Sequence, residues 1–183
     1  MKETQMISSP ELSVTQLPVK TPVYGTLVGL MNVKNFDFGK EVVHRLGAEL
    51  EVALQKADTK SIKLLLRFLA ELANANVVLP SALLSIFDQM LVSVGENKGD
   101  EVILGQRRSD FFVYAILSTL PYAGRELADR NPEELDRVLD TIEAYLSKRS
   151  SAVNAVVAVY DTEEVRICGI FCVLRGGEGR RTY

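Results

Sequence analysis

The sequence contains few of the residues that build catalytic and metal sites. It has 183 residues, with one histidine, two cysteines and no tryptophan. A single histidine, His44, excludes histidine-clustered metal sites such as H-E-x-x-H. Two cysteines are too few for a disulfide framework, so the composition predicts an intracellular, reducing compartment. We therefore expect a protein that is not an enzyme, with no catalytic residues, no cofactor and no metal.

Long apolar runs and a strong excess of basic residues are also missing. No stretch approaches the roughly 18 apolar residues that a membrane span needs, so we expect no membrane partner. The N-terminal string MKETQMISSPEL lacks the apolar centre of a secretory signal. Lys and Arg number 21 against 24 Asp and Glu. This balance argues against a globally basic nucleic-acid binder but not against a local basic patch.

Amphipathic helices are the pattern that the sequence does contain. Thr21 and Pro22 are typical of an N-cap and a first helical residue, so they predict the start of a first helix. Asp37 is the expected cap of a second helix. Asp58 or Thr59 is expected to open a third, because apolar residues recur at spacings of three and four after each of these positions.

Three further helices are predicted in the second half of the chain. A break at residues 79–81 precedes the fourth helix. The glycine-punctuated segment 95–108 is predicted to be a connection. Ser109 is expected to cap the fifth helix, which is predicted to stop at Pro121. Asn131 precedes a proline and two glutamates and is the expected N-cap of the sixth helix.

The six predicted helices form three consecutive pairs. The pairs begin near residues 21, 59 and 109, and these spacings bracket the period of about 40–47 residues that HEAT-type repeats show. The sequence therefore predicts an all-α fold, a HEAT-like α-solenoid of antiparallel helix pairs or a bundle. After Arg149 the strings VNAVVAVY and VRICGIFCVL are β-branched, and they predict a hairpin-like or disordered tail.

The first predicted helix has two unusual features. Gly25 and Gly29 lie four residues apart on it, and small residues at this spacing let another helix pack closely. The string YGTLVGLM also has no polar cap before it, whereas a terminal solenoid repeat needs a polar outer face. We therefore expect marginal stability, or association through this end.

Basic residues are patterned at two places. Lys60, Lys63 and Arg67 recur at three and four on the predicted third helix, opposite its leucines, and are expected to form one exposed ridge. Arg107 and Arg108 form a second cluster before the fifth helix. Both are candidates for contact with RNA phosphates or an acidic partner, since each cation neutralises charge and releases counterions. A simple solvated helix face is the alternative.

Three long strings resemble a known family. They are LPVKTPVYGTLVGLMNVKNFDFGKEVV, LLRFLAELANANVVLPSALLSIFDQML and SDFFVYAILSTLPYAGRELADRNPEELDRVLDTIEAYLSKRSS. They resemble the first of the three MIF4G-type helical domains in the large subunit of the nuclear cap-binding complex, and they are most similar to plant members. The resemblance implies a HEAT-like stack of helix pairs and a scaffold without enzymatic activity.

The resemblance also implies partners and a location. The family's large subunit binds a small RNA-recognition-motif subunit that holds the 7-methylguanosine cap, and together they serve pre-mRNA splicing, mRNA export and nonsense-mediated decay. It thus implies the small subunit, capped RNA and RNA export or processing factors as partners. It implies the nucleus as location, with the cytoplasm as a second one.

The resemblance predicts three regions in the chain. Residues 1–16 are expected to be unstructured, 17–151 to form a MIF4G-type domain that is incomplete at its start, and 152–183 to form the divergent tail. The abrupt end of the resemblance is typical of a truncated gene model, a retained intron or a splice variant. A generic HEAT-like adaptor that binds only proteins, or a truncated non-functional fragment, therefore remain as alternatives. The main small-subunit interface is expected to be absent.

Overall fold

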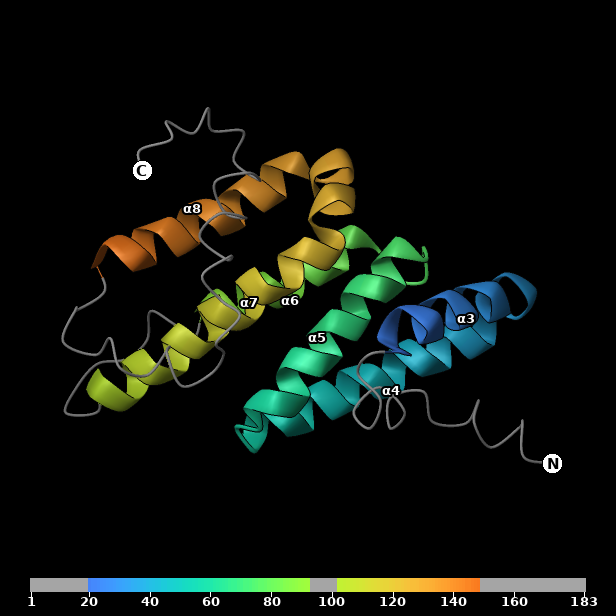
Figure 1. Cartoon of the computed structure of the whole chain (residues 1–183), viewed down its shortest axis with the longest axis horizontal. Helices are drawn as coiled ribbons and strands as arrows, with labels where there is room; N and C mark the ends of the chain where they lie inside the picture. The colour runs from blue at the N-terminus through green and yellow to red at the C-terminus, as the bar shows by residue number, and fades with distance from the viewer. Residues whose placement is uncertain (1–19, 93–101, 149–183) are drawn as a thin grey trace. The chain divides into compact units, whose positions relative to one another are not determined.

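The computed structural model describes residues 20–92 and 102–148, and within these ranges all regular structure is helical. The predicted all-α, HEAT-like fold is confirmed there, whereas the predicted tail lies outside the described residues. The helices in chain order are α3 (Thr21–Lys34), α4 (Phe36–Gln55), α5 (Thr59–Asn74), α6 (Pro80–Val92), α7 (Val102–Arg130) and α8 (Pro132–Lys148) (Figure 1).

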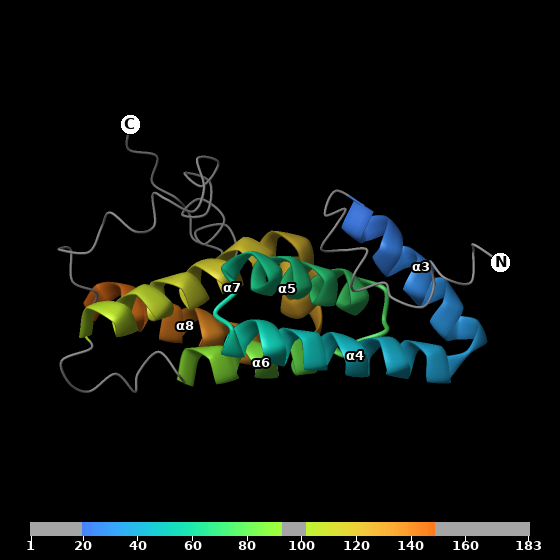
Figure 2. The same cartoon turned by 90° about the horizontal axis from the view of Figure 1, so that it is seen from below.

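The chain divides into two compact units, Met1–Leu83 and Leu84–Tyr183. The boundary falls within α6, and each unit has its own packed helices. In the first unit, α3, α4 and α5 all contact one another (Figure 2). Their buried apolar side chains lie at helical spacing and include Val28, Val42, Leu46, Leu50, Ile62, Leu65, Leu66 and Leu69.

The helix starts of the first unit follow local capping chemistry, with two corrections to the sequence prediction. Asp58 caps α5 as expected, and its carboxylate accepts a hydrogen bond from the backbone N–H of Ser61. The cap of α4 is Asn35 and not Asp37, because the Asn35 side chain accepts from the N–H groups of Asp37 and Phe38. Thr21 is the first residue of α3 and fully buried, so its predicted capping role is also wrong.

The glycines of α3 set its distance from α5. A Cβ atom at Gly25 would lie 2.8 Å from Cβ of Glu71, and one at Gly29 would lie 2.9 Å from Cβ of Ala75. Real Cβ atoms essentially never approach so closely. The predicted close packing through the two glycines is therefore confirmed, and α5 is the helix that packs there.

The second unit contains α7 and α8, which contact each other. Pro121 lies inside α7 and does not end it, contrary to the prediction. The helix continues because Leu120, Ala123 and Leu127 keep one face buried on both sides of the proline. Figure 1 shows α7 changing direction in its C-terminal part, as expected where a proline removes one backbone hydrogen bond.

The start of α7 also differs from the sequence prediction. The helix begins at Val102, so residues 102–108 are helical and not part of the predicted connection. Ser109, the expected cap, is buried in the helix interior. The hydroxyl of Tyr145 in α8 lies 3.4 Å from the carbonyl oxygen of Gln106 and donates to Asp110, so α8 stabilises these first turns. The other part of the predicted connection, 95–101, lies outside the described residues.

Candidate RNA and partner surface

The three basic residues of α5 lie in different environments. Lys60 is exposed, but Lys63 and Arg67 are half-buried, and the Nε atom of Arg67 has almost no contact with solvent. The prediction of one exposed ridge is therefore wrong for two of its three members. The spacing of three and four places all three side chains toward one side of α5, as expected.

The burial of Lys63 and Arg67 has a structural reason. Both α3 and α4 pack against α5, and buried residues lie around much of this helix. Phe68 and Ala70 are buried as well, although neither belongs to the predicted leucine stripe. A helix covered on several sides has only a narrow exposed strip, so the aliphatic stems of long cations are partly enclosed.

The electrostatic environment of Lys60 includes a nearby carboxylate. Asp58 accepts hydrogen bonds from the hydroxyl of Ser61 at 2.7 Å and from its backbone N–H at 3.2 Å. These bonds lower the pKa of the Asp58 carboxyl below its usual value, with Lys60 making a smaller contribution. Asp58 is therefore ionised at neutral pH and reduces the positive potential around Lys60.

Arg107 and Arg108 form the more accessible basic pair. Both are exposed, and they lie in the early turns of α7 and not in a connection before it. The guanidinium carbon of Arg108 lies 5.2 Å from the ring centroid of Phe112, one helical turn on. A cation over an aromatic face is held electrostatically, and its orientation is restricted by this contact. Arg108 therefore presents a partly ordered guanidinium to solvent.

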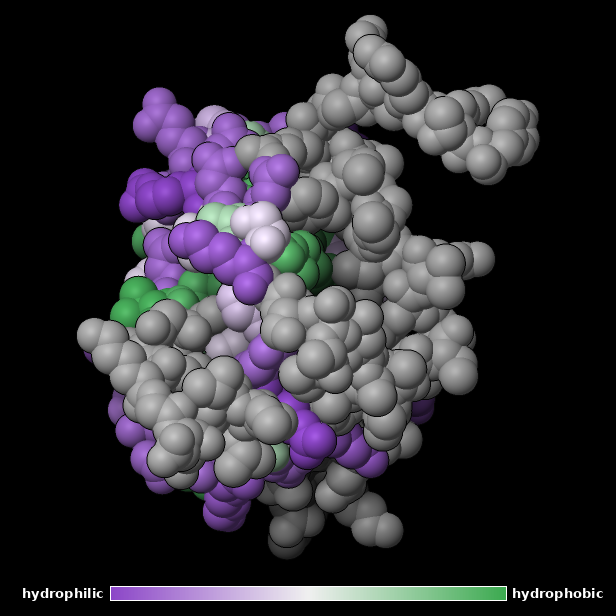
Figure 3. All heavy atoms as spheres, turned by 90° about the vertical axis from the view of Figure 1, so that its left-hand side faces the viewer, coloured by the Kyte–Doolittle hydropathy of each residue, from purple (hydrophilic) through white to green (hydrophobic). Residues whose placement is uncertain are grey.

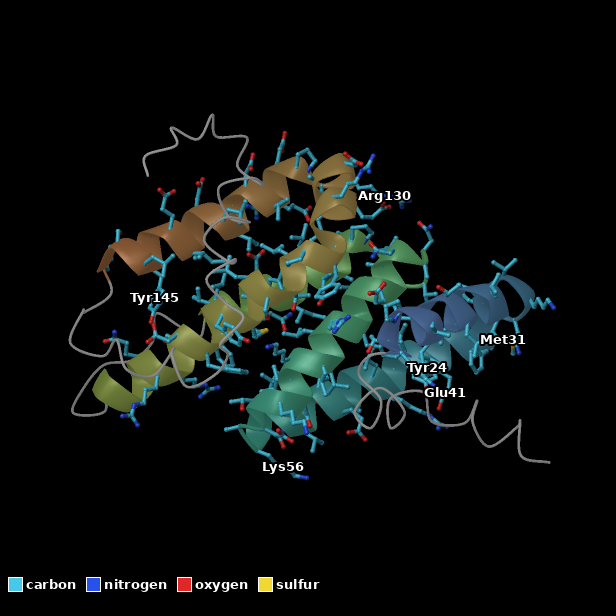
Figure 4. All side chains as sticks on the ribbon, in the orientation of Figure 1. Tyr24, Met31, Glu41, Lys56, Arg130 and Tyr145 are labelled. Atoms are coloured by element: carbon cyan, nitrogen blue, oxygen red, sulfur yellow. The ribbon has the colours of Figure 1, made fainter. Side chains whose placement is uncertain are left out.

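A hydrogen bond to a buried aspartate supports the turn that carries this pair. The Tyr145 hydroxyl donates to Oδ1 of Asp110 at 2.8 Å, and Asp110 is buried. Figure 4 shows the Tyr145 side chain reaching from α8 toward α7. Where α7 begins and α8 ends, the described side chains on the surface are mostly hydrophilic, with smaller hydrophobic areas between them (Figure 3).

The two basic groups belong to different units. Lys60, Lys63 and Arg67 share α5 in the first unit, and Arg107 and Arg108 are neighbours on α7 in the second. His44 is exposed on α4. Within residues 20–92 and 102–148, no group of three or more His, Cys, Asp or Glu side chains could hold a metal ion. Among the helices in these ranges, none combines the length and apolarity that crossing a membrane requires.

An apolar surface lies on α3, the helix for which the sequence predicts marginal stability or association. Four large apolar side chains of this helix are exposed: Val23, Leu27, Leu30 and Val33. They follow one another at intervals of four and three residues, so they share one side of the helix. We call these four residues the α3 apolar face. Its sequence signal is the absence of any charged residue from Thr21 to Val33.

Comparison with known proteins defines the class of this helical chain. The MIF4G domain family matches residues 13–164, which is most of the sequence. The chain belongs to the MIF4G domain family. The matched range is wider than residues 17–151, over which the three strings resemble the family.

The similar proteins carry the name nuclear cap-binding protein subunit 1. The chain is 43% identical over 141 residues to nuclear cap-binding protein subunit 1 of Arabidopsis thaliana, which covers 75% of this chain and 16% of the relative. It is 39% identical over 151 residues to the protein of that name from Oryza sativa subsp. japonica, and this match covers 81% of this chain and 17% of the relative. Nuclear cap-binding protein subunit 1-A of Xenopus laevis is 36% identical over 148 residues, and this match covers 81% of this chain and 18% of the relative. The predicted resemblance is thus confirmed, over less than a fifth of each relative's length.

Proposed function

We propose that the chain is a subunit-like scaffold of the nuclear mRNA cap-binding complex and acts in RNA metabolism. The observation that carries the proposal is the 43% identity, over 75% of the chain, to a protein named nuclear cap-binding protein subunit 1. A fold of packed helix pairs supports it, because such folds provide extended binding surfaces. The nucleus is the location that this function requires, and the cytoplasm is a second location.

The proposed partners are a small cap-binding subunit, capped RNA and RNA export or processing factors. In this proposal the scaffold takes part in cap-dependent pre-mRNA splicing, mRNA export and nonsense-mediated decay through protein and RNA interactions. The chain spans between 16% and 18% of the length of the relatives it matches. The main interface for the small subunit is therefore proposed to lie outside this chain, and a weak contact is expected.

We propose that RNA contact falls mainly on the exposed cations. Lys60, Arg107 and Arg108 are accessible to phosphates, whereas Lys63 and Arg67 are half-buried. Arg is suited to bidentate contact with phosphate, and the Phe112 ring holds the Arg108 guanidinium near α7. We therefore expect the α7 pair to contribute more to RNA affinity than the cations of α5.

A direct binding measurement tests the proposed function. The purified full chain is titrated with the small cap-binding subunit and followed by sedimentation velocity. Formation of a heterodimer supports the scaffold. The triple variant Lys60→Ala/Arg107→Ala/Arg108→Ala is a matched control, because its protein contact is expected to persist while its RNA affinity falls. Absence of any complex at the highest concentrations at which both proteins stay in solution would overturn the proposal.

A protein-only HEAT-like adaptor is the second candidate. The half-burial of Lys63 and Arg67 favours it, since it reduces the basic surface available to RNA. The acidic balance of the chain points the same way. This candidate predicts that the full chain captures protein partners while its RNA affinity is unaffected by the triple substitution. If the chain is a truncated fragment without function, it should bind neither protein partners nor RNA.

A further inference from the structure

We propose that the α3 apolar face and the groove beside it bind an amphipathic helix of a partner protein, one with a Lys or Arg at the edge of its apolar side. Val23, Leu30 and Val33 are 63%, 62% and 86% exposed, although α3 bears no charge before Lys34. Helices that are apolar on all sides are normally enclosed by protein. This binding role goes beyond the proposed function in the cap-binding complex and does not depend on it.

A shallow groove of about 380 Å³ runs beside this face, within the first unit. Leu30 and Val33 belong to the α3 apolar face and also line the groove, so the two surfaces are continuous. Gly29 and Ala75 line it where α3 meets α5, and a Cβ atom at Gly29 would lie 2.9 Å from Cβ of Ala75. Because neither residue has a side chain longer than a methyl group, the groove stays open above their contact.

The walls of the groove favour a helical occupant over an extended one. Its lining residues on α3 and α5 belong to helices, which bond most of their backbone N–H and C=O groups internally. These walls therefore offer few partners to the backbone of an extended peptide. Backbone groups that become buried need hydrogen bonds, and a helix makes most of them within itself. Apolar side chains at helical spacing on the partner can then pack along those of α3.

The charge at the groove favours a basic occupant. Among the described residues that line it, Glu71 is the only charged one, and it is half-buried on the α5 side. Lys20 and Lys34 lie at the two ends of α3 and do not line the groove. A carboxylate beside apolar side chains attracts a cation more strongly than a fully solvated one does. A Lys or Arg of the partner that reaches Glu71 would therefore strengthen binding, whereas an Asp or Glu would be repelled.

A second copy of the chain fits the face less well. The segment from Thr21 to Val33 has no charged residue, so a second α3 packed in register on the first could not bring a cation to Glu71. Stable dimers also bury about 800 Å² on each partner, and one side of a 14-residue helix, about 21 Å long, offers less. An area of this size suits a weak contact with a short helix, so we expect a dissociation constant in the micromolar range.

Synthetic peptides test both the apolar and the charged part of the proposal. The probe is a fluorescein-labelled helical peptide of about 16 residues, with leucine at every third or fourth position, one arginine beside the leucines, and alanine and glutamine elsewhere. Fluorescence anisotropy with the full chain should show saturable binding. A second peptide with glutamate in place of the arginine should bind about threefold to tenfold more weakly. This comparison uses the unaltered chain, so it is independent of any effect of a substitution on folding.

Substitutions in the full chain locate the binding. Leu30→Ser/Val33→Ser should weaken binding of the arginine peptide by about tenfold, because both side chains line the groove. Val52→Ser, at an exposed position of α4, is the matched control and should leave the affinity unchanged. Glu71→Gln should remove the preference for the arginine peptide, whereas Glu51→Gln, exposed on α4, should keep it. Circular dichroism verifies that each variant is folded.

The outcomes separate the occupants. Absence of saturable binding, or equal affinity for the two peptides, overturns the proposal. Equal affinity of the parent chain and Leu30→Ser/Val33→Ser for the arginine peptide places the binding elsewhere and also overturns it. A dimer of the full chain in sedimentation velocity that Leu30→Ser/Val33→Ser abolishes assigns the face to a second copy and contradicts the proposal. None of these measurements contains the cap or the small subunit, so a failure here is distinguishable from a failure of the proposed function.

Discussion

The hydroxyl of Tyr145 donates a hydrogen bond to the buried carboxylate of Asp110 at 2.8 Å, and this bond joins the C-terminal part of α8 to the third turn of α7. The two residues are 35 positions apart. The same hydroxyl lies 3.4 Å from the carbonyl oxygen of Gln106. The turn that carries Arg107 and Arg108 is therefore supported from α8.

Removal of this hydroxyl should destabilise the second unit. We expect Tyr145→Phe to lower the free energy of unfolding by about 1–3 kcal/mol, because hydrogen bonds to charged groups are stronger than average and the carboxylate stays buried. Urea unfolding measures the change. Thr141→Ala is the matched control, since its hydroxyl bonds only to the carbonyl of Arg137 in the same helix. Equal effects of the two substitutions would contradict the role of Tyr145.

Glycine substitutions test the close approach of α3 and α5. Gly25→Ala and Gly29→Ala should each lower the free energy of unfolding by about 1–3 kcal/mol, because overpacking forces the backbones apart. Gly47 on α4 is the matched control, since a Cβ there meets nothing within 4 Å. Gly47→Ala should raise the free energy of unfolding by about 0.5–1 kcal/mol through helix propensity alone. Stabilisation by all three substitutions would show that α3 and α5 are not in close contact.

The stabilisation that the Asp58 cap of α5 gives to the folded protein should depend on pH. Bonds from Ser61 lower the pKa of Asp58 in the folded state, so the ionised cap stabilises the protein above the unfolded pKa of about 3.9. This stabilisation is lost as the pH falls through the lower folded pKa. The advantage of the parent chain over Asp58→Asn should therefore be present at neutral pH and disappear under acid conditions. Ser61→Ala should shrink the same pH-dependent difference, and a difference that does not vary with pH would contradict the assignment.

RNA affinity should respond unequally to the two basic groups. Arg107→Ala/Arg108→Ala is expected to weaken single-stranded RNA binding and to reduce the slope of log K against log salt by about 0.7 for each lost phosphate contact. Lys63→Ala/Arg67→Ala changes the charge by the same amount at half-buried positions, and should reduce the slope less. Fluorescence anisotropy at several salt concentrations measures both. Identical slopes for the two variants and the parent chain would exclude both groups from RNA contact.

Local sequence chemistry predicted the helices better than their ends and surroundings. Asp58 was identifiable as a cap because its carboxylate bonds within three residues of itself. Pro121 was misleading, because burial of Leu120 and Ala123 outweighs one lost backbone hydrogen bond. Tyr145, a residue far along the chain, donates a hydrogen bond to Asp110 in the early turns of α7, and no local sequence pattern contains that contact.

The candidate site was predicted less completely than the fold. Spacing correctly placed Lys60, Lys63 and Arg67 on one helix, but their exposure depends on the packing of α3 and α4 against α5. The family could be predicted because long strings of residues carry it, and strings do not depend on tertiary packing. The roles of Lys60, Lys63, Arg67, Arg107 and Arg108 in RNA contact stay a prediction.

The most direct test of the central claim is retention of the full chain on a 7-methylguanosine cap-analogue resin, measured with and without the small cap-binding subunit. The scaffold account predicts that the chain is retained only when the small subunit is present, and that free cap analogue elutes both while unmethylated GTP does not. If the small subunit alone is retained and the chain stays in the flow-through at every ratio tested, the chain is not a scaffold of this complex.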